Sequence, residues 1–189
     1  MSRRIGLAVV ILFSFFAANR LSADAYSWTG NAGGLYDWSV ANNWFNNTTG
    51  TVNGFPSLST DSVTITGGTG NPRLDANQNI GSLTITGKSL NSAGALRLNV
   101  YGDATITGAG TFASNIILVM WAASTLNATR TLGSLEVNAT GLTVLLGNNL
   151  TLAGYSNIVA GVTFILFFED ILVGLRKGAV IHLLGIIDL

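Results

Sequence analysis

The chain has 189 residues, and its nine basic and nine acidic side chains give it a formal net charge of zero. Binding to nucleic acid is disfavoured, because phosphates are neutralised by clustered Lys and Arg side chains and the sequence contains no such cluster. The absence of cysteine excludes disulfides and thiolate metal sites. The length fits one domain.

Residues 1–25 have the pattern of a secretory signal peptide. Two arginines near the N-terminus precede an apolar run over residues 5–18, and Ala23-Asp24-Ala25 supplies the small residues typical of a cleavage site. The apolar run is shorter than the about 20 residues that a membrane-spanning helix requires. We therefore expect an exported protein, extracellular or at the cell surface or outer membrane, whose mature chain begins at Tyr26 and has no stable membrane span.

Residues 26–60 are rich in aromatic side chains interleaved with Asn and Gly, among them Trp28, Trp38 and Trp44. Two interpretations stay open for the tryptophans. Their indole rings could stack on sugar rings, as in a carbohydrate-binding module. They could equally cap the first coil of a repeat fold, whose apolar core and backbone edges would otherwise face solvent. Their place at the start of the mature chain favours an aromatic N-terminal cap.

Residues 61–157 form a body of short repeats. Runs of alternating apolar and polar residues, each closed by Gly or Asn, are typical of stacked β-strands. The phrase Ile80-Gly-Ser-Leu-Thr-Ile-Thr-Gly87 returns in modified form as Leu132-Gly-Ser-Leu-Glu-Val-Asn138. The body therefore predicts an all-β, repetitive fold.

Four apolar positions of this body, Ile65, Ile85, Ile106 and Leu126, are spaced by 20 or 21 residues. That length suits one coil of a parallel β-solenoid. The 52 residues between the two copies of the phrase are not a multiple of it, so either coil lengths vary or one of the two patterns is coincidental. The alternative fold is an antiparallel β-sandwich, which short strands and frequent turns also permit.

Side chains at alternate positions of the expected strands should point inward. The strands are expected at Ser62–Thr66, Ser82–Thr86, Leu96–Tyr101, Ala104–Thr107, Ile116–Trp121, Ser134–Val137, Leu142–Leu146 and Leu150–Leu152. The inward-facing residues are expected to be Val63, Ile65, Leu83, Ile85, Leu96, Leu98, Val100, Leu135, Val137, Leu142 and Val144.

Residues 158–189 form an apolar tail in which the rhythm of Gly, Asn and Thr stops. No stretch of the tail reaches 18 apolar residues without a charge, so a membrane span is disfavoured. One interpretation is a set of core strands that turn at Glu169-Asp170 and Arg176-Lys177. The other is a segment that is not native to the fold.

Three motifs of the first half follow one another in a distinctive order: Trp28-Thr-Gly-Asn31, Asp37-Trp38-Ser-Val-Ala-Asn-Asn-Trp44 and Thr60-Asp-Ser-Val-Thr-Ile65. This order resembles the N-terminal part of bacterial surface proteins of the autotransporter-passenger and adhesin type, over roughly residues 26–155. The resemblance implies a right-handed parallel β-helix, displayed outside the cell, with a structural or adhesive role.

Candidate catalytic carboxylates are scattered. Hydrolysis of a polysaccharide requires two carboxylates held across a cleft. The acidic residues of the mature body lie apart in the sequence, in contexts typical of turns and caps. They are Asp37, Asp61, Asp75, Asp103 and Glu136.

Cofactor and metal motifs are weak. The segments 81–89 and 108–113 match phosphate- and dinucleotide-binding loops only in part, because strands rather than a helix are expected after each. The only histidine, His182, lies in the tail and has no accompanying ligand cluster. We expect neither a cofactor nor a bound metal.

The leading hypothesis is an exported, non-enzymatic structural or adhesive β-repeat protein of the bacterial surface, whose partner is a surface polysaccharide or another extracellular surface. Two alternatives stay open. One is a carbohydrate-binding module that uses Trp28, Trp38 and Trp44. The other is a polysaccharide lyase or glycosidase on the same β-helix, with carboxylates drawn from Asp61 to Glu136.

Overall fold

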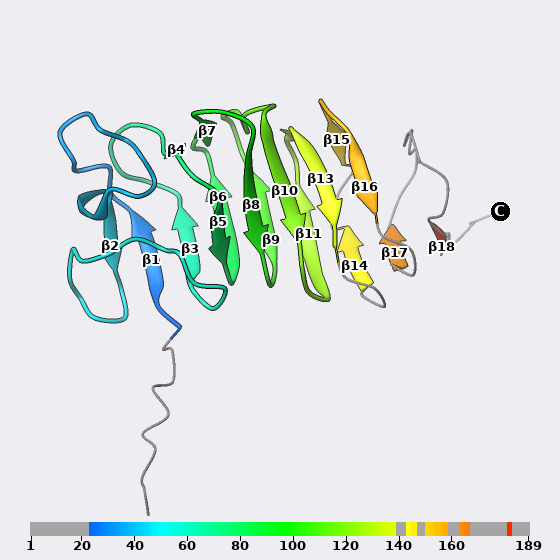
Figure 1. Ribbon diagram of the computed structural model, residues 1–189, viewed down its shortest axis with the longest axis horizontal. Coiled ribbons are helices and arrows are strands. Elements are labelled where there is room, and N and C mark those ends of the chain that lie inside the picture. Colours follow the sequence, from blue (N-terminus) through cyan, green and yellow to red (C-terminus); the bar gives the residue numbers. More distant parts are fainter. Residues whose placement is uncertain (1–22, 139–142, 147–149, 159–162, 167–180, 183–189) are drawn as a thin grey trace, which may run out of the picture.

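The computed structural model of the chain describes residues 23–138, 143–146, 150–158, 163–166 and 181–182. Within them, short strands wind into a parallel β-solenoid, in which one coil follows the next along a single long axis (Figure 1). The strands β1 (Ala25–Trp28) and β2 (Trp44–Asn46) lie at one end of this axis, and β18 (Ile181–His182) lies towards the other. No helix in the described part is long and apolar enough to cross a membrane.

Two sheets make up most of the solenoid. The larger has nine strands, in the spatial order β18, β17 (Thr163–Leu166), β14 (Thr143–Leu146), β11 (Ser124–Ala128), β9 (Ala104–Thr107), β6 (Ser82–Thr86), β3 (Ser62–Ile65), β1 and β2. The second has five strands, in the order β16 (Ser156–Ile158), β13 (Ser134–Val137), β10 (Ile116–Met120), β8 (Leu96–Val100) and β5 (Gln78–Ile80).

Smaller elements complete the coils. Two two-stranded sheets are formed by β4 (Arg73–Leu74) with β7 (Asn91–Ser92) and by β12 (Thr131–Leu132) with β15 (Thr151–Leu152). A short 3-10 helix, η1 (Ala41–Asn43), directly precedes β2.

Successive coils follow the same path. The chain passes from β6 in the nine-stranded sheet through β7 to β8 in the five-stranded sheet, and then enters β9, which pairs in parallel with β6. Every strand pair in the described residues is parallel except β1 with β2. The β-solenoid prediction is therefore confirmed, and the alternative of an antiparallel sandwich is wrong.

The pairing register follows the predicted coil length of about 20 residues. The first three of the four evenly spaced apolar residues pair with one another, as predicted. The fourth, Leu126, pairs instead with Ala104, and Ala128 takes the place beside Ile106. Facing alternates at every residue, so a displacement by two positions leaves Leu126 on the inner side, where it is buried.

The repeated phrase marks a corner of the coil rather than an equivalent strand. Its first copy enters β6 of the nine-stranded sheet, whereas its second copy enters β13 of the five-stranded sheet. Both copies turn at a glycine where neighbouring coils are close. A Cβ at Gly81 would lie 2.8 Å from the Thr60 carbonyl group, and one at Gly133 would lie 2.4 Å from the Ile116 oxygen. The repeated phrase therefore marks tight glycine corners, whereas the spacing of 20 or 21 residues gives the length of a coil.

The apolar core runs through the middle of the coils. Nine of the eleven residues predicted to point inward are buried, and none of these nine exposes more than 1% of its surface. Leu96 is partly buried against the core, and Leu142 lies outside the described residues. The bounds of β6, β9 and β13 match the prediction. The residue pattern did not predict several strands, among them β5 and β11.

Two segments of the apolar tail join the nine-stranded sheet. β17 pairs in parallel with β14, and β18 pairs in parallel with β17. This arrangement is the one expected if the tail supplies strands to the solenoid. The turns expected at Glu169-Asp170 and Arg176-Lys177 lie outside the described residues.

Replacing Ile85 by Ala should lower the free energy of unfolding by about 2–5 kcal/mol, because its fully buried side chain stacks between Ile65 and Ile106. Chemical denaturation measures the change. Thr84→Ala is the matched control, since Thr84 is the neighbouring residue of β6 but is partly exposed. An equal loss in both variants would contradict the inward assignment of Ile85.

A chain that ends at Asn157 should denature at a lower temperature than the full chain. The cut removes β17 and leaves the backbone of β14 unpaired on that side. Thermal denaturation of the two chains measures the difference. An unchanged or higher midpoint would show that the tail contributes no stability to the solenoid.

Candidate functional site

The three tryptophans of the N-terminal segment form an aromatic cluster. The ring centroids of Trp28 and Trp44 are 5.0 Å apart and those of Trp38 and Trp44 are 4.7 Å apart, both edge to face. Each indole N–H donates to a backbone carbonyl at 2.7–3.2 Å. Trp28 exposes only 3% of its surface, and the other two expose none. The hypothesis that these rings stack on a glycan is therefore corrected, because burial leaves no indole face open to a sugar.

Each candidate carboxylate accepts hydrogen bonds that hold the fold. Asp61 precedes β3 in the nine-stranded sheet, whereas Glu136 lies in β13 of the five-stranded sheet, so these two candidates belong to different sheets. The hydrogen bond from Arg73 holds the pKa of Asp37 below its usual value. The donors are Arg73 for Asp37, main-chain N–H groups for Asp61 and Asp103, Ser39 for Asp75, and Arg97 with Tyr155 for Glu136.

The described residues form no metal site. No group of three or more His, Cys, Asp or Glu side chains there could hold an ion. His182 belongs to β18, but its side chain lies outside what the structure describes.

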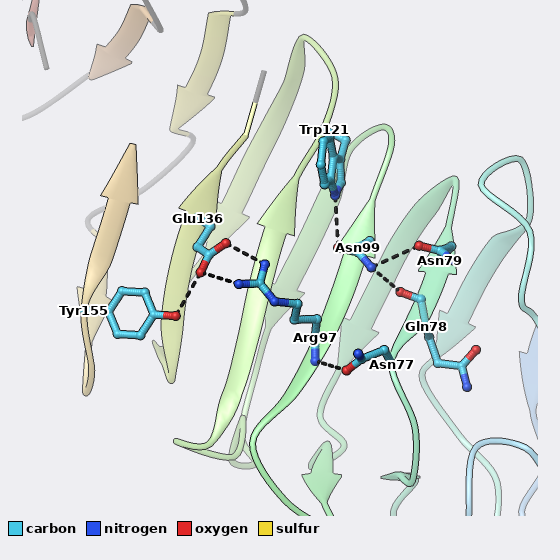
Figure 2. Close-up of polar contacts among 8 residues, drawn as sticks. All are labelled: Asn77, Gln78, Asn79, Arg97, Asn99, Trp121, Glu136 and Tyr155. Carbon is cyan, nitrogen blue, oxygen red and sulfur yellow. Dashed lines mark hydrogen bonds and ion pairs between the residues drawn. The ribbon is translucent and has the colours of Figure 1, made fainter. Parts of the chain in front are cut away.

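A surface that the sequence did not predict covers the outer side of the five-stranded sheet. Side chains at alternate positions of these strands and of their flanking residues point away from the core. Figure 2 shows those of this surface, except Tyr101, reaching across neighbouring coils. We call this surface the polar-aromatic face; its residues are Asn79, Arg97, Asn99, Tyr101, Trp121, Glu136 and Tyr155.

An ion pair crosses one strand of this face. Both terminal nitrogens of Arg97 in β8 donate to the Glu136 carboxylate in β13, at 2.6 and 2.9 Å, although β10 lies between these strands. The Arg97 side chain therefore passes over β10 (Figure 2). In β10, Leu118 and Met120 belong to the inner core, so strand alternation turns Val119 between them outward. Val119 is nevertheless fully buried. Its burial fits a cover formed by the side chains above it.

Tyr155 adds a third member to the ion pair. Its O–H donates to Oε1 of Glu136 at 2.9 Å. The Glu136 side chain is 8% exposed and that of Arg97 is 40% exposed, so the carboxylate is the buried partner. Hydrogen bonding to Glu136 raises the pKa of Arg97 and, together with burial, the pKa of Tyr155. Near neutral pH, Arg97 is therefore charged and Tyr155 is a neutral donor.

An amide and two aromatic rings form the other half of the face. The Asn99 side-chain nitrogen donates to the Asn79 side-chain oxygen at 3.0 Å and to the Gln78 carbonyl at 3.2 Å. Its side-chain oxygen accepts from Nε1 of Trp121 at 3.0 Å. The Trp121 ring lies nearly parallel to that of Tyr101, with centroids 6.0 Å apart and planes inclined by 10°. The two bonds from its nitrogen orient the Asn99 amide, and the bond to its oxygen orients the Trp121 indole in turn.

The aromatic half places two partly exposed rings beside side-chain amides. Tyr101 is 39% exposed and Trp121 is partly exposed, so neither ring is confined to the core. A sugar presents an apolar C–H face that packs on aromatic rings, and hydroxyl groups that pair with amides. Asn79 and Asn99 supply such amides beside the rings.

Part of the polar-aromatic face could have been predicted from the sequence. Once Leu98 and Val100 are placed inward, alternation places Arg97, Asn99 and Tyr101 outward. The pairing of Arg97 with Glu136 could not be predicted, because it depends on the register of β10 and β13, which are linked by one shorter coil.

Comparisons of the chain with protein-family models, with curated proteins and with solved structures found no match. The resemblance to autotransporter passengers and adhesins therefore stays a prediction from the motifs.

Replacing Arg97 by Met should destabilise the fold by about 1–3 kcal/mol, because Met keeps an apolar stem over β10 but leaves the Glu136 carboxylate without its cation. This range lies below that of a fully buried pair, since the Arg97 side chain is 40% exposed. Chemical denaturation measures the change.

Two further variants test the coupling. Arg73→Met is the matched control and should have a smaller effect, because Arg73 pairs with Asp37 at a more exposed position. Adding Glu136→Gln to Arg97→Met should recover part of the loss. Strictly additive losses would contradict a direct coupling between Arg97 and Glu136.

Proposed function

We propose that the chain is an exported, non-enzymatic β-solenoid of the bacterial cell surface with a structural or adhesive role, and that the polar-aromatic face is its contact surface for a carbohydrate polymer. The observation that carries the proposal is the nearly parallel pair of Tyr101, which is exposed, and Trp121, which is partly exposed, beside the amides of Asn79 and Asn99. Export rests on the signal-like pattern of residues 1–25.

The shape of the solenoid supports a polymer as the ligand. Coils that stack in parallel repeat the same outward positions at the spacing of neighbouring strands, about 4.8 Å. Residues of the polar-aromatic face consequently follow one another along the long axis, from β5 to β16. An extended chain of sugars could lie along this row and contact several coils at once.

The state of the carboxylates supports a role without catalysis. A general acid or base must exchange protons with its substrate, within hydrogen-bond reach. Glu136 is 8% exposed and is occupied by Arg97 and Tyr155. Asp61 is 2% exposed and is occupied by main-chain N–H groups. Both carboxylates serve as fixed acceptors of the fold.

Trp121→Ala and Tyr101→Ala should each weaken binding to a glycan array by about fivefold to tenfold, the loss expected from about 1–1.5 kcal/mol of aromatic contact. Leu35→Ala is the control, because Leu35 is 64% exposed but belongs to the N-terminal segment. Circular dichroism should show that all three variants stay folded. Binding that is indifferent to both aromatic variants would overturn the assignment of the face, and turnover of any polymer would overturn the non-enzymatic role.

A further inference from the structure

The segment just before β1 is built into the fold. The Asp24 carbonyl accepts from the Ser62 N–H at 2.8 Å, and the Asp24 carboxylate accepts from the Asn46 side-chain amide at 3.0 Å. Ala25 is the first residue of β1 and pairs in parallel with Ser62. Its carbonyl accepts from the Asn47 N–H at 2.7 Å. A mature chain that began at Tyr26, as the sequence pattern favours, would lose all of these contacts.

A buried carboxylate receives the Asp24 nitrogen. Asp61 is 2% exposed, and its Oδ1 accepts from the Asp24 N–H at 3.3 Å. Its Oδ2 accepts from the N–H groups of Ser57 and Leu58, both at 3.0 Å. The ion pairs found among the described residues involve other carboxylates, so none of them pairs Asp61 with a cation. A carboxylate that is buried as an anion is costly unless it is compensated.

The two carboxylates at this place raise the pKa of a neighbouring side chain. Burial raises the pKa of Tyr26, and the charges of Asp24 and Asp61 raise it further. A cation at the Asp24 nitrogen would lie 3.3 Å from Oδ1 of Asp61. A free α-amino group carries a positive charge near neutral pH, whereas the peptide nitrogen there is neutral.

We propose that signal removal cuts the bond between Ala23 and Asp24, and that the new α-ammonium group of Asp24 pairs with the buried carboxylate of Asp61 and fixes β1 in the sheet. This inference rests on the proposed export of the chain. A water molecule cleaves the peptide bond: its hydroxyl joins the Ala23 carbonyl carbon, its hydrogen joins the Asp24 nitrogen, and a solvent proton completes the ammonium. The peptidase is that of the export machinery.

The position of Ala23 is compatible with this cut. Ala23 supplies the small residue directly before the cleaved bond, although Leu21 stands where the pattern has its other small residue. Ala23 is also exposed and lies outside β1. The Ala25–Tyr26 bond, in contrast, lies within β1, between the partner strands β2 and β3. A cut at Asp24 keeps every contact of β1, and it replaces the neutral N–H that donates to Asp61 by a cationic ammonium donor.

Export of the full chain from a bacterial host tests the position of the cut. N-terminal sequencing and intact-mass measurement of the purified exported protein should give a chain that begins at Asp24. A chain that begins at Tyr26 would overturn this inference and leave the proposed export intact. An exported chain that keeps residues 1–22 would likewise overturn this inference, whereas a chain that stays inside the host would overturn the proposed export.

Acylation of the α-amino group in the exported protein tests the ion pair. Only the unprotonated amine reacts, so contact with Asp61 should slow acylation at pH 7 several-fold relative to Asp61→Asn. Asp103→Asn is the matched control and should leave the rate unchanged. Like Asp61, Asp103 directly precedes a strand of the nine-stranded sheet, and its carboxylate accepts from a main-chain N–H, that of Thr125. Equal acylation rates in the wild type and Asp61→Asn would overturn the ion pair, and the sequencing result stands if that variant fails to fold.

Discussion

In a parallel solenoid, the backbone N–H and C=O groups of each strand have to form hydrogen bonds with strands of the adjacent coils, because water cannot reach them inside the stack. This ladder limits what the corners can do. Coil length changes from place to place: Leu118 pairs with Leu135, 17 residues later, whereas Leu126 pairs with Leu146, 20 residues later. The variation is absorbed between strands, since a slip by one residue within a strand would turn its apolar side chains outward.

Corners carry a polar requirement as well as a steric one. Backbone carbonyls that leave the ladder at a corner still need donors when they are buried. Arg130, 7% exposed, donates from its guanidinium group to three backbone carbonyls of preceding coils, and burial lowers its pKa. Lys88 donates in the same way to two carbonyls of the coil before its own. In a chain with so few charges, these two cations satisfy the backbone rather than acidic side chains.

The same ladder explains how far the sequence could predict the structure. Alternation of apolar and polar residues identified β6, β9 and β13 and the inward side chains, because period-two facing depends only on neighbouring residues. The position of Leu126 and the strand β11 depend on how many residues a corner consumes, which local pattern does not encode. The tryptophans failed as a site for a related reason: a ring that stacks on sugar and a ring that closes a core have the same sequence signature.

Function in such a molecule is confined to surfaces that the core does not use. Inward positions are fixed by packing, and the aromatic cluster at the β1–β2 end is fixed by the need to cover the first coil. The outward positions of the five-stranded sheet have neither constraint, except where Arg97 and Glu136 cover Val119. Arg97 and Glu136 are 39 residues apart in the chain and meet only because β8, β10 and β13 are held in register. The backbone ladder that stabilises the solenoid therefore also assembles the polar-aromatic face, so a corner that shifted the register would disrupt both together.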